Sequence, residues 1–177
     1  MPEVSRYMYT DHQITAAEHD QWFHRVKTDH ACRYWIIECD DQDVGLVNLY
    51  DIDRSNKRCF WAFYLSSPHV RGKGVGGYVE YTVLCHVFNE LKLQKLCCEV
   101  LAFNEPVIHM HESFGFKREG TFRRHIRKGG QFHDVVRLAI LSDEWAQIRP
   151  RMGTRLQQRG VLPKDPRENQ RLQNTPS

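Results

Sequence analysis

A strand, a glycine-rich turn and a helix follow one another near the middle of the chain, and this order restricts the fold more than any other feature. Residues 59–65 (CFWAFYL) are aromatic and apolar enough for a buried strand, which Pro68 ends. The turn that follows lacks side chains at four positions, namely Gly72, Gly74, Gly76 and Gly77. Backbone N–H groups can converge there on an anion, at the positive end of the next helix. The stretch therefore predicts a phosphate-binding turn.

The spacing of these glycines argues against two common nucleotide sites. It lacks the glycine pattern and the later acidic residue of dinucleotide-binding folds, and it lacks the Lys-Ser/Thr ending of the phosphate loop. On the glycine pattern alone, a turn that merely connects two elements remains an equal alternative.

The elements around the turn predict one mixed sheet. In chain order we expect a helix over 15–26, strands over 33–39 and 44–52, a helix over 76–91, a strand over 93–101, a helix over 104–114 and a hairpin around 128–130. Short polar turns join the first three strands into an antiparallel meander. A helix connects the aromatic strand to the next one, so these two must run parallel. Thr15 and Glu18 form a capping box at the start of the first helix.

Composition indicates an ordinary folded protein. A chain of 177 residues with 41% hydrophobic and 27% charged residues fits one domain, which we place at residues 1–148. Residues 149–177 are basic and rich in Gln, Pro and Asn, so we expect a disordered, solvated tail; contact of this tail with RNA or an acidic surface is the weaker alternative.

No long apolar run and no signal pattern are present, so we expect a cytoplasmic protein without a membrane span. The six cysteines lack disulfide-framework or zinc spacing and are expected to be reduced residues of the core, and we expect no metal site.

Two ordered motifs carry a resemblance to a known family. The segment Arg71-x-x-Gly74-x-Gly76 resembles the acetyl-coenzyme A signature of the GCN5-related N-acetyltransferases (GNAT), and residues 104–116 (NEPVIHMHESFGF) resemble that family's Asn-x-x-Ala-x-x-x-Tyr…Gly-Phe segment. Val107 stands where Ala is usual, and His111 stands where Tyr is usual.

The resemblance implies an α+β fold of three layers, with a mixed, mostly antiparallel sheet between helices and without the first strand and helix with which family members begin. It implies acetyl-CoA as co-substrate. The residues expected to hold this co-substrate are Leu65, Ser66, Arg71, Gly72, Lys73, Gly74, Val75, Gly76 and Asn104.

Acetyl transfer to an amine needs a proton acceptor for the amine and a proton donor for the departing thiolate. Glu99 lies in an otherwise apolar strand, where burial would suit it to accept a proton, and a related subgroup carries Glu at this position; a surface or ion-paired carboxylate is the alternative. The resemblance implies that His111 points toward the coenzyme sulfur and acts as the acid, whereas a packed histidine is the alternative.

The segment of residues 6–23 (RYMYTDHQITAAEHDQWF) resembles the nucleotide-sugar acetyltransferases of pseudaminic acid biosynthesis, a pathway of flagellin glycosylation. These enzymes acetylate the 4-amino group of UDP-4-amino-4,6-dideoxy-N-acetyl-β-L-altrosamine. The resemblance implies that Tyr9, His19 and Trp22 bind the UDP-amino-sugar, with Tyr50 and Tyr64 as weaker candidates that the core would also explain.

Two other functions remain open. The first is a ribosomal-protein-type N-terminal acetyltransferase, and the second is an acyl-CoA-binding module with impaired catalysis. We expect no nucleic acid partner. A sheet edge left exposed would favour association into a homodimer.

Overall fold

The computed structural model describes residues 6–9, 14–70 and 72–162. Within them lies a single six-stranded sheet in the order β1-β2-β3-β4-β6-β5. The strands are β1 (Arg33–Cys39), β2 (Gln42–Asp53), β3 (Arg58–Leu65), β4 (Lys95–Leu101), β5 (Lys117–Lys128) and β6 (Gln131–Leu141). The helices are α2 (Ala16–Thr28), α3 (Val75–Cys85), α4 (Glu105–Ser113) and α5 (Ser142–Gln158), with shorter turns η1 (Pro68–Val70) and η2 (His86–Glu90).

The sheet has the predicted topology. Strands β1, β2 and β3 form an antiparallel meander, and β4 runs parallel to β3 after the crossover through α3. The hairpin of β5 and β6 turns at Gly129 and Gly130, whose φ angles of 55° and 79° favour glycine. The mixed, mostly antiparallel sheet is therefore confirmed.

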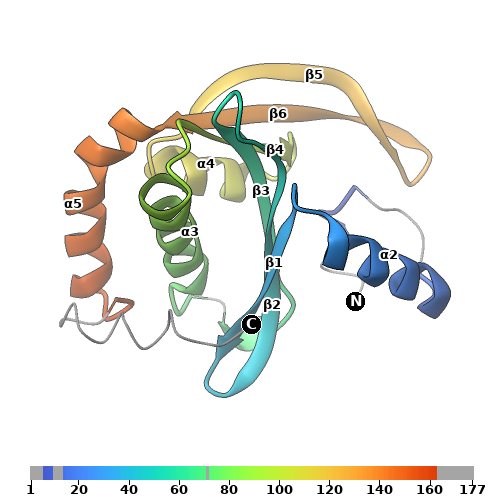
Figure 1. The fold of residues 1–177 in the computed structure, drawn as a ribbon, viewed down its shortest axis with the longest axis horizontal. Coiled ribbons are helices and arrows are strands. Elements are labelled where there is room, and N and C mark those ends of the chain that lie inside the picture. Colours follow the sequence, from blue (N-terminus) through green and yellow to red (C-terminus); the bar gives the residue numbers. More distant parts are fainter. Residues whose placement is uncertain (1–5, 10–13, 71, 163–177) are drawn as a thin grey trace.

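Helices cover both faces of the sheet, which gives three layers. Figure 1 shows α3, α4 and α5 on one side of the sheet and α2 on the other. The main core lies on the three-helix side and includes Trp61 of β3, Leu84 of α3 and Trp145 of α5, each at most 1% exposed. Because strand side chains alternate, Phe60, Cys97 and Ala139 form a small second cluster on the α2 side, with Tyr50 packed against it.

Helix α2 starts as predicted. The Thr15 hydroxyl accepts a hydrogen bond from the Glu18 N–H, and the Glu18 carboxylate accepts one from the Thr15 N–H at 2.8 Å. The helix buries no residue fully, and the edge of Trp22 packs against the ring of Tyr34 with centroids 5.0 Å apart. Helix α2 is therefore a loosely attached cover over the start of the sheet.

The domain boundary expected at residue 148 is wrong. Helix α5 continues to Gln158 and buries Met152 and Leu156, and Leu162 beyond it is 7% exposed. The basic composition concealed these apolar positions, which recur at helical spacing on the face toward α3. Residues 163–177 of the expected tail lie outside the described residues.

Three buried cysteines should be inert in the native protein. Burial raises the pKa of the Cys59 thiol to about 12 and also raises the pKa values of Cys97 and Cys98. Since the thiolate is the nucleophile, we expect iodoacetamide at pH 8 to leave these three unmodified in the native chain and to label all six cysteines in urea. Peptide mass mapping measures this, and equal labelling of the three in both states would contradict their burial.

Candidate active site

The centre of the sheet opens between two neighbouring strands. Strands β3 and β4 pair at Arg58↔Lys95, Cys59↔Leu96 and Phe60↔Cys97. Beyond Phe60, β3 continues to Leu65 and β4 to Leu101, without further pairing between them. The strands therefore diverge, and the backbone groups along this opening are available to a ligand.

The glycine turn lies between the end of β3 and the start of α3. Gly72 and Gly74 have φ angles of 78° and 81°, a backbone conformation that favours glycine. Gly74 is the N-cap of α3 and has no side chain that could cap the helix, so the first amides lack both an N-cap acceptor and an intrahelical acceptor within the described part of the chain. This arrangement fits a pyrophosphate.

The turn leaves no room for a side chain at Gly74, and at Gly76 an added Cβ atom would reach ordinary contact distance from α4. A Cβ atom at Gly74 would lie 2.5 Å from Cγ2 of Val161, and one at Gly76 would lie 3.5 Å from Sδ of Met110. The residues after α5 and those of α4 therefore pack closely around the glycine turn, and any larger residue at position 74 must displace Val161.

Four more of the expected coenzyme residues lie near the glycine turn. Leu65 ends β3 and Val75 begins α3. Ser66 donates from both its N–H and its hydroxyl to the Val44 carbonyl, at 2.7 and 3.1 Å, so its role there is to fix the strand end. Lys73 pairs with Asp40 at 3.0 Å, with both side chains largely exposed. Arg71 lies outside the described residues.

Asn104, the last of the expected coenzyme residues, is the N-cap of α4. Its backbone N–H donates to the Leu101 carbonyl at 2.8 Å, and its side chain makes no capping hydrogen bond. The amide side chain is therefore available to a ligand at the end of β4.

Glu99 lies in a polar group rather than in apolar surroundings. Its carboxylate accepts a hydrogen bond from the Tyr9 hydroxyl at 3.3 Å and pairs with Nη1 of Arg137 at 3.4 Å. Burial, followed by the charge of Glu99, raises the pKa of Tyr9. The expectation of an apolar environment was wrong because Arg137, directly opposite Glu99 on β6, supplies the partner.

Three aromatic or cationic side chains complete this polar group on the α2 side of the sheet. The Arg137 guanidinium carbon lies 4.3 Å from the centre of the Phe60 ring, and the Tyr50 ring lies 5.4 Å from Phe60. Burial and the nearby charge of Glu99 raise the pKa of Tyr50. The structure thus brings Tyr9, Tyr50 and Glu99 together, as a shared pocket requires.

The other expected acceptor residues lie elsewhere. His19 and Trp22 are on α2, where their rings are 5.6 Å apart, and His19 is mostly exposed. Tyr64 is a half-buried residue of β3, opposite Leu46 of β2. Within the described part of the chain, none of these three contacts the group around Glu99.

His111 is a buried residue of α4. It is 3% exposed, and its Nδ1 lies 2.8 Å from Oε1 of Glu80, a wholly buried residue of α3. The rings of Trp61 and Phe116 flank the imidazole, each with its centroid 5.3 Å away. Burial raises the pKa of Glu80, and the hydrogen bond with His111 opposes that shift.

Sequence reasoning missed two charged residues of the site. Arg137 and Glu80 are each the single charged residue within an apolar stretch, VVRLAIL and GGYVEYTVL respectively. A buried charge needs a partner, so each of these isolated charges could have been taken as a sign of a pair across elements.

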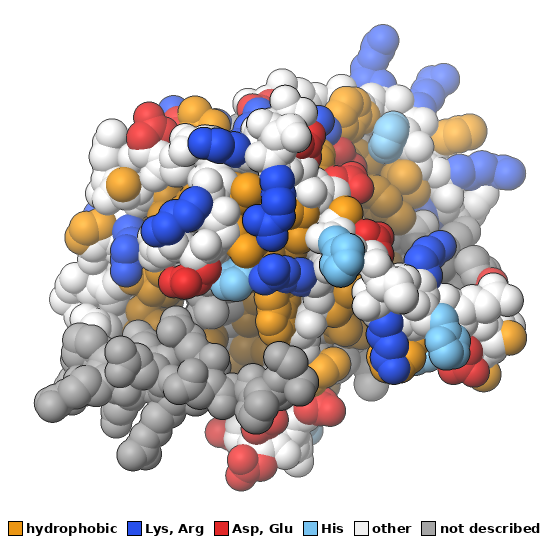
Figure 2. Space-filling view, viewed as in Figure 1, with side chains coloured by type: hydrophobic (Ala, Val, Ile, Leu, Met, Phe, Trp, Pro, Cys, Tyr) orange, Lys and Arg blue, Asp and Glu red, His pale blue; other side chains and the backbone are white. Residues whose placement is uncertain are grey.

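Positive charge continues from Arg137 toward the free end of the β5–β6 hairpin. Between the position opposite Arg137 and the hairpin turn, β5 carries four basic residues, namely Arg123, Arg124, Arg127 and Lys128. The other two bases of β5, Lys117 and Arg118, lie toward α5 and pair with Glu144 and Glu112. Figure 2 shows Lys and Arg side chains gathered at the upper right, where Figure 1 places the free end of this hairpin. On β6, the ring of His133 packs against Phe103 at 5.2 Å.

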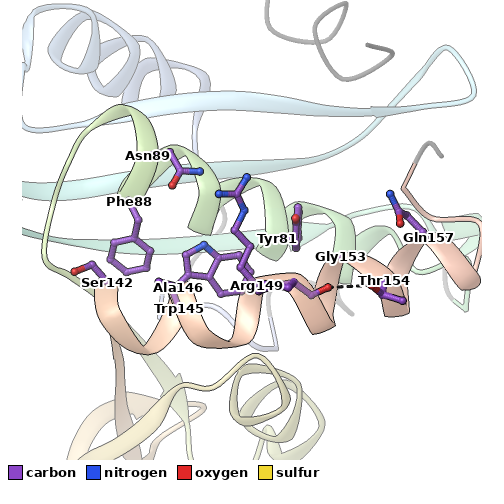
Figure 3. A pocket seen from close by; sticks show the side chains of 11 residues that line it. Tyr81, Phe88, Asn89, Ser142, Trp145, Ala146, Arg149, Gly153, Thr154 and Gln157 are labelled. Atoms are coloured by element: carbon purple, nitrogen blue, oxygen red, sulfur yellow. Dashed lines mark hydrogen bonds between the residues drawn. The ribbon is translucent and has the colours of Figure 1, made fainter. Parts of the chain in front are cut away.

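A groove of about 470 Å³ lies between α3 and α5, away from these residues. Figure 3 shows Arg149, Trp145 and Asn89 along this groove. The Thr154 hydroxyl donates a hydrogen bond to the Pro150 carbonyl. None of the residues expected to bind coenzyme or acceptor lines this groove. We therefore place the site at the diverging strands instead.

Comparisons with known proteins agree with this geometry. Residues 1–117 match a family model described as an acetyltransferase (GNAT) domain. The SPbeta prophage-derived uncharacterized N-acetyltransferase YokL of Bacillus subtilis is 30% identical over 144 residues, which cover 81% of each chain. The spermidine N(1)-acetyltransferase of Escherichia coli is 27% identical, over 80% of this chain and 76% of its own.

Solved structures share the fold. The spermidine N-acetyltransferase from Vibrio cholerae, in complex with CoA and spermine, superposes with a TM-score of 0.73 at 23% identity. The match covers 79% of this chain and 83% of that one. Another structure of the Vibrio cholerae enzyme is described as dodecameric. None of the described helices is both long and apolar enough to cross a membrane.

Proposed function

The chain belongs to the GNAT acetyltransferase family, and from this premise we propose that it acetylates the 4-amino group of a UDP-linked amino sugar. It is an acetyl-CoA-dependent N-acetyltransferase. The acceptor we propose is UDP-4-amino-4,6-dideoxy-N-acetyl-β-L-altrosamine, the substrate implied by the resemblance of residues 6–23 to the pseudaminic acid enzymes.

The position of the Arg137 guanidinium is the main support for this acceptor. Its guanidinium lies over Phe60 and beside Glu99, on the α2 side of the opening between β3 and β4. Guanidinium groups bind phosphate through paired hydrogen bonds, and aromatic rings such as Tyr9, Tyr50 and Phe60 suit a nucleobase or a sugar face. The positive hairpin next to it adds attraction for a diphosphate.

A polyamine is the second candidate, because three of the relatives are named spermidine N(1)-acetyltransferases. A polycation would need a site with an excess of acidic side chains, and one hollow contains acids. A space of about 530 Å³ bordered by Phe60 contains Asp51 and Asp53. The same lining includes Arg54 and Arg58, and Arg58 lies 3.8 Å from Asp53. The charges there balance, so this hollow favours neither a polycation nor an anionic acceptor.

Roles for the catalytic residues follow from this acceptor. Glu99 is the proposed proton acceptor, acting directly or through water, and Tyr9 and Arg137 hold its carboxylate in place. The amides at the start of α3 and the side chain of Asn104 would hold the coenzyme. Acetyl-CoA supplies the thioester that the amine attacks.

An assay of coenzyme A release from acetyl-CoA, run with one acceptor at a time, tests the proposal. We expect the full chain to turn over the UDP-amino-sugar with kcat/KM at least about 100-fold above that for spermidine or for an N-terminal peptide of a ribosomal protein, since charge-assisted contacts contribute about 1.5–3 kcal/mol each. A higher kcat/KM for spermidine or the peptide would overturn it.

Replacing Arg137 should weaken binding of the anionic acceptor. In Arg137→Gln we expect KM for the UDP-amino-sugar to rise roughly 10- to 100-fold, because one charge-assisted contact is lost. The same assay run on Arg151→Gln, an exposed arginine of α5, is the matched control and should match the parent chain. An unchanged KM in Arg137→Gln would exclude Arg137 from the acceptor site.

A further inference from the structure

The pair formed by Glu80 and His111 is the most deeply buried polar contact in the described residues. Glu80 is wholly buried, and His111 is 3% exposed. The contact joins Oε1 of Glu80 on α3 to Nδ1 of His111 on α4, at 2.8 Å. The second carboxylate oxygen, Oε2, has no hydrogen-bond partner among the described residues.

Stability alone does not explain such a pair. Removing a carboxylate from water costs several kcal/mol, and the attraction to its partner only partly offsets that cost. Apolar side chains of similar volume at such positions are often neutral or stabilising by about 1–4 kcal/mol. Burial of this pair is therefore weak evidence that it serves stability, and a chemical role is the other explanation for its place in the core.

The pair lies next to the point where the strands diverge. His111 contacts Trp61, the first residue of β3 beyond the last paired residue Phe60. Glu80 is close to Cys98, the first residue of β4 beyond the last paired residue Cys97, and its charge acts on that thiol. The two side chains thus meet the two strands where the opening for the thioester begins.

We propose that Glu80 is the positioning residue of His111: it holds Nδ1, so that Nε2 is the nitrogen that delivers a proton to the departing thiolate. The inference rests on the proposed acetyl transfer and on the role of acid that the family resemblance implies for His111. A carboxylate at Nδ1 fixes both the ring orientation and the tautomer, and it stabilises the imidazolium that must exist before transfer. The rings of Trp61 and Phe116 prevent the imidazole from turning away.

Protons balance over one turnover. The attacking amine gives up one proton to Glu99 or water, and the imidazolium gives its Nε2 proton to the coenzyme sulfur as the carbon–sulfur bond breaks. Neutral His111 keeps its Nδ1 proton on Glu80 and regains a proton at Nε2 before the next cycle. The products are the amide and free thiol, with no oxidant or reductant consumed.

Few other groups face the pair. Trp61 of β3 and Phe116 carry no charge, and Cys98 of β4 is the nearby titratable side chain. Burial first, and then the charge of Glu80, raises the pKa of Cys98, so its thiol stays neutral. Glu99, the next residue of β4, points to the opposite face of the sheet, where it pairs with Arg137.

Glu80→Gln should lower kcat roughly 10- to 1,000-fold and change KM for acetyl-CoA less than about threefold, because an isosteric amide keeps the packing but cannot stabilise the imidazolium. The alkaline limb of the kcat–pH profile should move to lower pH. The rate is measured with the acceptor that the parent chain uses best, or as acetyl-CoA hydrolysis. Glu112→Gln is the matched control, because Glu112 is a glutamate of α4 that is 33% exposed and pairs with Arg118.

A double-mutant cycle separates positioning from a structural effect. His111→Phe should lose roughly 100-fold in kcat, and adding Glu80→Gln to it should cost little more, since the two residues act as one unit. Additive losses, or an unmoved pH profile in Glu80→Gln, would overturn the proposal.

NMR of histidine ring nitrogens provides a readout that needs no acceptor. In the native chain, His111 should show a protonated Nδ1, and free coenzyme A should change the Nε2 signal while Nδ1 stays constant; His111→Gln identifies the signals. In Glu80→Gln the Nδ1 signal should change.

The same experiment separates failure of this inference from failure of the proposed acceptor. If coenzyme A binds and the Nε2 signal does not change, the positioning role is wrong even if the chain is an acetyltransferase. If amino sugars fail as acceptors while Nε2 responds, only the proposed acceptor is wrong.

Discussion

Gly74→Glu is expected to abolish the rise in melting temperature that acetyl-CoA causes. At a concentration 100 times Kd, a ligand that binds only the folded chain adds about 2.7 kcal/mol, which is about 5–10 °C for a domain of this size. The substitution places a side chain where Cβ alone would lie 2.5 Å from Val161, and its negative charge repels the pyrophosphate. The variant should also melt a few degrees lower without ligand, since φ at this position is 81°.

Gly120→Glu is the matched control for this prediction. Gly120 lies on β5, and a Cβ atom added there would have no atom within 4 Å, so the same change in size and charge meets open space. Thermal melts with and without acetyl-CoA should give the parent shift in this control. A full ligand shift in Gly74→Glu would show that the coenzyme does not bind at the glycine turn.

Shortening the buried side chains of α5 is expected to lower the stability of the fold strongly. Met152→Ala and Leu156→Ala should each lower the free energy of unfolding by about 2–5 kcal/mol, because each removes buried methylene groups from the packed core. Urea unfolding followed by circular dichroism measures the change.

Arg151→Ala and Arg155→Ala provide the comparison for α5. Both residues are exposed neighbours of the buried pair on the same helix, and both substitutions should change the free energy of unfolding by less than about 0.5 kcal/mol. Equal, small effects at all four positions would mean that residues beyond 148 are no part of the fold, as the sequence suggested.

The sequence was sufficient for the parts of the fold set by local pattern. The capping box at Thr15, the alternating strands of the meander and the glycine turn each depend on residues close together in the chain. The crossover through α3 then required β4 to lie parallel to β3, which the pairing of Arg58 with Lys95 confirms.

Contacts between residues far apart in the sequence could not be predicted from local patterns. Glu99 looked buried among apolar neighbours because Arg137 is 38 residues away and meets it only when β4 pairs with β6. Glu80 and His111, 31 residues apart, meet only when α3 and α4 pack together. The end of α5 was missed for a related reason, since its apolar positions are few and matter only against α3.

The glycine turn and the group around Glu99 lie in different places at the same opening. The glycine turn and Asn104 are at the ends of β3 and β4, and the group of Tyr9, Tyr50 and Glu99 is on the α2 side of the sheet. Because function depends on the whole site and not on one motif, an acceptor cannot be inferred from the glycine turn alone.

A direct competition between acceptors tests the central claim most sharply. The full chain is incubated with acetyl-CoA and equal concentrations of the UDP-amino-sugar and spermidine, and mass spectrometry follows both products over time. We predict that the acetylated sugar accumulates first, with NMR placing the acetyl group on the 4-amino nitrogen. Acetylspermidine as the main product would contradict the proposed acceptor, and Arg137 would then have a role other than binding a diphosphate.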